Sequence, residues 1–134
     1  MKRSDLVNVF KNNASSIGYN FYTGIEADIP FSAKLPAVWL IHPALKSSDG
    51  IRERKDSYEF KFLIIHNPIP RHNNEAVCTV MEQNADFLLN TLLDCPFVRK
   101  INKIKTKINT KPFTINGDIS LSVEADIQLS YYNY

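Results

Sequence analysis

The sequence is poor in glycine. Only four glycines occur in 134 residues, at positions 18, 24, 50 and 117. A loop that cradles a phosphate needs clustered glycines, because the backbone amides must approach the anion closely. The wide spacing therefore excludes a Walker A loop and a dinucleotide-binding glycine motif, and no G-x-S-x-G nucleophile elbow is present.

Cysteine is equally scarce, with Cys78 and Cys95 alone. Both fall on, or at the end of, one predicted helix. A helical segment of that length spans about 25 Å, whereas a disulfide needs Cα atoms within ~7 Å. We therefore expect two unpaired thiols buried in the core. Two cysteines do not make a zinc site, and the histidines His42, His66 and His72 lack ligand spacing, so no metal site is predicted.

Long hydrophobic runs are also absent. No stretch of ~20 apolar residues is available to cross a membrane. The N-terminus turns polar at once and lacks the apolar core of a secretory signal. These absences predict a cytoplasmic protein with no membrane contact. The formal net charge of +2 is too small to indicate nucleic-acid binding by itself.

The sequence does have an ordinary globular composition, with 44% hydrophobic and 22% charged residues, which predicts one domain over residues 1–134. The second of two predicted helices is expected to bury Val80 and Phe87 in its apolar stripe. The order αβββαββ predicts an α+β fold, with a mostly antiparallel sheet of about five strands and both helices on one face. The predicted helices cover residues 4–17 and 74–94, and the strands 19–23, 37–41, 58–65, 103–109 and 118–132.

Residues 42–56 form a long polar connection between two predicted strands. A connection of this length without an apolar pattern is usually functional or mobile. Asp49-Gly50 at its centre is also a turn signal, so the segment can instead be a protruding β-hairpin. The sequence leaves both alternatives open.

The last strand has the clearest pattern in the chain. Apolar and polar residues alternate almost without fault, which predicts a long antiparallel strand with one solvated face. Asn116-Gly117 before it predicts a type I′ turn. A two-residue turn at this position places Lys107 opposite Asp126 on the solvated face.

Glu59-Phe60-Lys61 is the one local pattern that suggests catalysis. Side chains at i and i+2 project from the same face of a strand, where a carboxylate can hold Mg²⁺ and a lysine can steady a water or a phosphate. The pattern is similar to the E-x-K half of PD-(D/E)xK nucleases. The Pro-Asp half is missing, so Asp49 or Asp56 would have to supply the second acid. A Mg²⁺-dependent nuclease is therefore an alternative function.

Basic side chains gather in two parts of the chain, namely the connection 42–56 and the stretch 99–111, which contains no acid. One interpretation is contact with nucleic acid or with an acidic partner. The other is a solvated sheet face whose lysines discourage edge pairing. The candidate contact residues are Lys46, Arg52, Arg54, Lys55, Lys103, Lys105 and Lys107.

The segments also follow one another in a distinctive order. A short helix leads to the aromatic strand Tyr-Asn-Phe-Tyr-Thr-Gly at 19–24, and Leu-Pro-Ala-Val-Trp-Leu follows at 35–40. A long polar connection, a phenylalanine-rich strand, a helix and a long alternating terminal strand come after them. This layout resembles the tail terminator, tail completion and neck proteins of tailed bacteriophages.

The resemblance implies a non-enzymatic structural subunit of a virion, assembled in the host cytoplasm. Such proteins form homo-oligomeric rings, sixfold or twelvefold, at the head–tail junction. Their partners are other connector and tail proteins, and DNA passes through the ring, with non-specific contact in its lumen. No catalytic residue, cofactor, metal or small-molecule substrate is implied. A small cytoplasmic adaptor domain is the remaining alternative.

Overall fold

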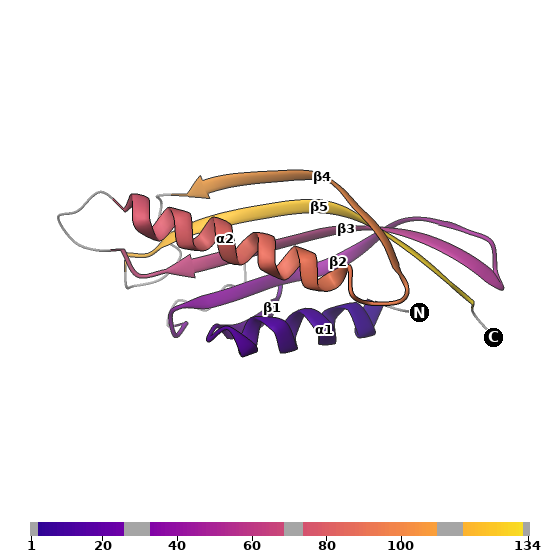
Figure 1. Cartoon of the computed structure of the whole chain (residues 1–134), viewed down its shortest axis with the longest axis horizontal. Helices are drawn as coiled ribbons and strands as arrows, with labels where there is room; N and C mark the ends of the chain where they lie inside the picture. The colour runs from indigo at the N-terminus through magenta and orange to yellow at the C-terminus, as the bar shows by residue number, and fades with distance from the viewer. Residues whose placement is uncertain (1–2, 26–32, 69–73, 110–116, 133–134) are drawn as a thin grey trace.

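The computed structural model describes residues 3–25, 33–68, 74–109 and 117–132. A sheet and a pair of helices form two layers (Figure 1). The α+β class and the order αβββαββ predicted from the sequence are confirmed. The elements are α1 (Arg3–Ser16), β1 (Asn20–Gly24), β2 (Ala37–Asp49), β3 (Glu53–His66), α2 (Glu75–Leu92), β4 (Val98–Asn109) and β5 (Ile119–Tyr132).

The five strands form one mixed sheet in the order β1-β2-β3-β5-β4. β1 is parallel to β2, and every other neighbouring pair is antiparallel. β3 and β5 lie at the centre and pair along the whole of β3. β1 and β4 are therefore the two edge strands.

The main core lies between the sheet and both helices. The ring of Phe10 in α1 is fully buried, and its centroid lies 4.8–6.2 Å from those of Phe21, Phe60 and Phe62. The predicted alternation of β5 is confirmed, because its apolar residues point into this core. The residues that α2 buries are Met81, Ala85, Leu88, Leu89 and Leu92.

On the other face of the sheet, the buried apolar cluster among the described residues is small and consists of Trp39, Leu63 and Ile65. Elsewhere this face carries the polar residues of β3 and β5 and the lysines of β4. We call it the bare face, because no described helix packs on it. None of the described helices is both long and apolar enough to span a membrane.

Two predictions about α2 are wrong. Val80 and Phe87 are 44% and 43% exposed instead of buried, because the helix turns Met81 and Leu88 toward the sheet. Both cysteines are unpaired as predicted, but only Cys95 is buried, while Cys78 is half-buried.

The predicted register of β4 against β5 is also wrong. Lys107 lies opposite Ser122, four residues from its predicted partner Asp126. An even shift keeps every side chain on its face, so the lysines remain on the bare face. β4 also bulges between Asn102 and Lys105. The residue Asn116, on which the turn prediction rests, lies outside the described residues.

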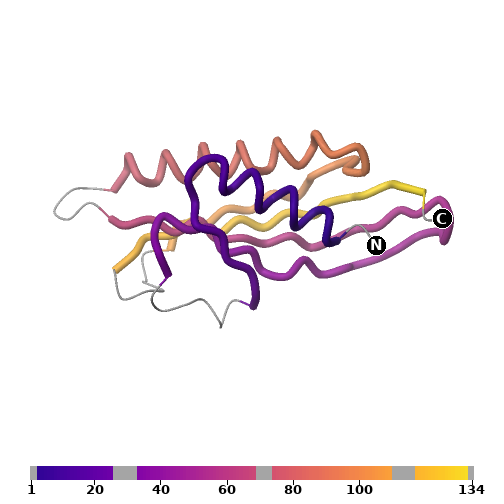
Figure 2. Tube along the Cα trace, turned by 90° about the horizontal axis from the view of Figure 1, so that it is seen from below, coloured from indigo at the N-terminus to yellow at the C-terminus, as the bar shows by residue number. Residues whose placement is uncertain are grey.

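The connection 42–56 is a hairpin, which was one of the two alternatives. β2 and β3 pair as far as Asp49 opposite Lys55 and project beyond the helices (Figures 1 and 2). Gly50 turns the chain with φ +79°, and a Cβ there would collide with the carbonyl oxygen of Glu53. We call residues 42–56 the arm.

A buried chain of hydrogen bonds ties the start of β1 to β3 and α2. Asn84 Nδ2 donates to the Tyr19 hydroxyl at 2.7 Å, and this hydroxyl lies 2.6 Å from His66 Nε2. Which of the two groups donates in the contact between Tyr19 and His66 depends on the tautomer of the ring. Burial lowers the pKa of His66, which favours a neutral ring.

We expect this half-buried histidine to make folding pH-dependent. A pKa lowered in the folded state means that the unfolded chain binds the proton more tightly, so stability is lost as the pH falls below about 6.5. Urea unfolding at pH 7.5 and 5.5 should show a smaller difference in His66→Gln than in the wild type. His42→Gln, at an exposed position, is the control. An unchanged difference in His66→Gln would contradict the assignment.

Candidate assembly surfaces

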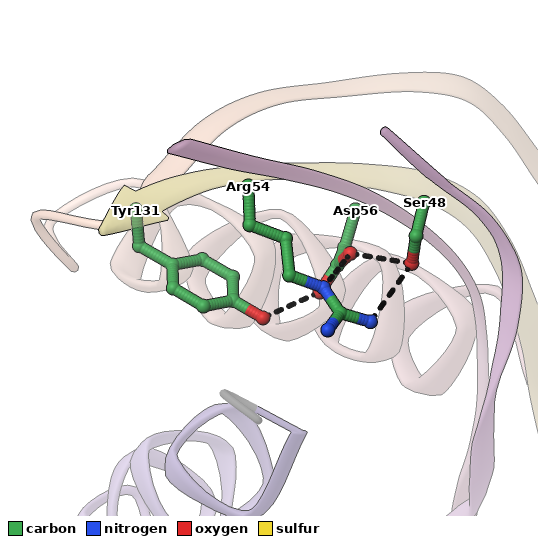
Figure 3. A network of polar contacts seen from close by, with 4 residues as sticks. All are labelled: Ser48, Arg54, Asp56 and Tyr131. Carbon is green, nitrogen blue, oxygen red and sulfur yellow. Dashed lines mark hydrogen bonds and ion pairs between the residues drawn. The ribbon is translucent and has the colours of Figure 1, made fainter. Parts of the chain in front are cut away.

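A buried carboxylate holds the arm together (Figure 3). Asp56 Oδ1 accepts hydrogen bonds from Ser48 Oγ at 2.6 Å and Arg54 Nε at 2.9 Å. Asp56 Oδ2 accepts one from the Tyr131 hydroxyl at 2.6 Å. Arg54 also donates to Ser48 Oγ at 3.1 Å, which closes the network. We call these four residues the arm network.

Strand geometry explains why the arm network forms. Arg54 and Asp56 are two residues apart on β3 and so share a face. Ser48 lies opposite Asp56 on β2, and Tyr131 lies opposite Arg54 on β5. The network therefore joins three strands at the end of the sheet that the helices leave uncovered.

The environment of Asp56 favours its ionised form. Burial by itself raises the pKa of a carboxyl group, but the hydrogen bonds from Ser48, Tyr131 and Arg54 outweigh it and lower the pKa of Asp56. Burial and the bond to Asp56 raise the pKa of Tyr131 to about 12. Arg54, a candidate contact residue, is thus engaged inside the arm.

Three other candidate residues gather on the bare face. Lys46 Nζ lies 3.1 Å from both carboxylate oxygens of Asp126, and Lys103 Nζ lies 3.8 Å from Oδ2. Lys105 lies opposite Glu124 on β5. Strands far apart in sequence therefore meet at Asp126, which the predicted register had placed beside Lys107.

The remaining candidates are dispersed. Arg52 is exposed at the tip of the arm, between β2 and β3. Lys55 is exposed on the bare side of the arm, where it lines an open cavity of about 440 Å³ with Arg99. Lys107 lies opposite Ser122 at the far end of β4. The seven residues do not converge on one site.

The E-x-K pair lies as predicted on one face of β3. Lys61 Nζ is 3.6 Å from Glu124 Oε1, and Glu59 lies opposite Asp126. Asp56 is on the other face, inside the arm network. Asp56 therefore cannot complete a metal site with Glu59. Within the described residues, no three side chains among His, Cys, Asp and Glu are grouped to hold a metal ion.

An acidic flank of α2 was not predicted. Glu75, Glu82 and Asp86 are exposed, at spacings of seven and four residues that place them along one side of the helix. Exposed Val80 and Phe87 lie on the same helix. The sequence indicates such a flank, because the predicted helix contains no basic residue. The flank was missed because the predicted apolar stripe included Val80 and Phe87.

Comparison with known proteins adds no family. No protein-family model matches the chain, and no curated protein matches it.

Proposed function

We propose that this protein is a structural subunit of a bacteriophage virion that forms a homo-oligomeric ring at the head–tail junction. It assembles in the host cytoplasm, contacts other connector and tail proteins, and lets DNA pass through the ring. Support comes from the order of helices and strands, which is the one predicted from the sequence. Support also comes from the arm, where β2 has a free edge.

The arm is the observation that carries this proposal. β1 covers β2 only as far as Ile41, and beyond it β2 pairs with β3 alone among the described residues. Leu45 on this uncovered segment is 42% exposed, and Ile51 in the turn at the tip of the arm is 82% exposed. A free edge with exposed apolar residues is where a sheet adds a strand from another chain. A ring supplies such a neighbour to every subunit.

We expect the wild type to form a closed oligomer in solution. Light scattering or native mass spectrometry should give a closed multiple of 15.3 kDa, about 92 kDa for a sixfold ring. Ile51→Glu should weaken assembly, because it places a charge at the centre of an apolar contact. Ile25→Glu is the matched control, since Ile25 is 52% exposed outside the arm.

Three results would contradict this proposal. Equal assembly of the Ile51→Glu and Ile25→Glu variants would exclude the arm tip from the subunit contact. A strict monomer that cleaves DNA with Mg²⁺, and loses this activity in Lys61→Ala, would favour the nuclease instead. A monomer with one specific bound protein would favour the adaptor.

A further inference from the structure

Charges of opposite sign are segregated between α2 and β4. The helix carries the acidic flank of Glu75, Glu82 and Asp86 and no basic residue. β4 carries no acid. Its basic residues are Arg99, Lys100, Lys103, Lys105 and Lys107.

The chain itself leaves most of these charges unpaired. Among the described residues, none of the three flank acids takes part in an ion pair. Of the β4 cations, only Lys103 has one, with Asp126. All are exposed. The acidic flank therefore carries charge that no described cation neutralises, whereas the β4 cations share the bare face with Glu124 and Asp126.

The two patches also lie on different sides of the molecule. The acidic flank belongs to the helix layer. Lys105 and Lys107 lie opposite Glu124 and Ser122 of β5, which places them on the bare face. A second copy can therefore offer its helix layer to the bare face of the first.

This arrangement discriminates between modes of self-association. A symmetric face-to-face dimer would bring acids against acids. A back-to-back dimer would join two bare faces that each mix the β4 lysines with Glu124 and Asp126, so neither symmetric mode gives the acidic flank a basic partner. Like charges brought together cost several kcal/mol, whereas a head-to-tail contact pairs acid with base. Head-to-tail contacts are also those that generate rings or filaments.

We propose that the β4 edge of the bare face in one copy docks on the acidic flank of α2 in the next copy. The inference rests on the ring function proposed above and names a subunit contact of that ring in addition to the arm. Both surfaces also offer an apolar anchor, namely Leu93 beside the flank and Ile104 between the lysines of β4, which are 46% and 53% exposed. Apolar anchors within a charged rim are typical of protein interfaces.

Charge reversal in the full chain tests the interface. Glu82→Lys/Asp86→Lys and Lys105→Glu/Lys107→Glu should each raise the dissociation constant of the oligomer at least about 100-fold, because like charges then meet. Raised salt should weaken the wild-type oligomer, since exposed charges are screened. Lys11→Glu/Lys34→Glu changes net charge by the same amount at exposed sites elsewhere and should leave assembly intact.

Mixing the two reversed variants gives the decisive result. One variant carries a basic flank and basic strand, and the other an acidic flank and acidic strand. An equimolar mixture should therefore assemble again, with the two variants alternating around the oligomer. The fourfold variant Glu82→Lys/Asp86→Lys/Lys105→Glu/Lys107→Glu should also assemble by itself, because each contact again joins opposite charges.

The outcomes separate this interface from the ring function. A wild-type ring that neither reversal weakens, or reversals that the mixture does not rescue, would overturn the interface and leave the ring proposal standing. Open filaments with rescued reversals would support the interface and contradict a closed ring. A wild type that stays monomeric at every concentration would overturn both. Circular dichroism should show unchanged folding in all variants.

Discussion

Replacing Asp56 with alanine is expected to lower the free energy of unfolding by about 3 kcal/mol, the lower end for breaking a buried pair. Three donors lose their acceptor at once, and Arg54 keeps a half-buried charge with no carboxylate beside it. A hydrogen bond to a charged group is worth roughly 1.5–3 kcal/mol, so the sum is large even after relaxation. Urea unfolding followed by circular dichroism measures the loss.

Acid pH should reproduce part of this effect in the wild type. The pKa of Asp56 is lowered in the folded state, so its contribution is complete above the unfolded value of about 3.9. It is lost as the pH falls through the lower folded value. The Asp56→Ala variant should lack this part of the acid dependence.

Asp49→Ala is the matched control for the arm network. Asp49 is exposed near the arm tip and should change stability by no more than about 0.5 kcal/mol. Equal losses in the two variants would show that the buried network contributes nothing specific. A loss in Asp56→Ala below about 1 kcal/mol would likewise contradict it.

Phe10→Ala is expected to be the most destabilising single change, at about 3–5 kcal/mol. The ring is fully buried between α1 and the sheet, where it contacts the rings of Phe21, Phe60 and Phe62. Its removal leaves a cavity that β1 and β3 would have to close. Because α1 buries only Leu6, Phe10 and Ala14, this helix depends strongly on one ring.

Phe87→Ala provides the contrast. Phe87 is a helical phenylalanine with 43% of its surface exposed, so its loss should cost less than about 1 kcal/mol in a monomer. Chemical denaturation at low protein concentration compares the two variants. Similar losses for Phe10→Ala and Phe87→Ala would contradict the observed difference in burial.

Alternation along β5 and the apolar periodicity of α1 were sufficient to predict the two layers. Only one geometry of each segment buries its apolar side chains. The fold class, the order of the elements and the face that carries the lysines could therefore be predicted from local residues. Asp49-Gly50 similarly indicated the turn of the arm. The E-x-K spacing predicted correctly that Glu59 and Lys61 share a face, since side-chain direction alternates along any strand.

Long-range pairing could be decided only by the tertiary structure. The register of β4 against β5 includes a bulge between Asn102 and Lys105, which periodicity does not specify. Val80 and Phe87 have the spacing of core residues, but the rotation of α2 on the sheet leaves them exposed. The burial of Asp56 depends on Ser48 and Tyr131, which reach it from other strands. Residue types and local hydrophobic periodicity are properties of a single segment. Strand register, helix rotation and hydrogen-bond partners are determined only when distant segments pack together.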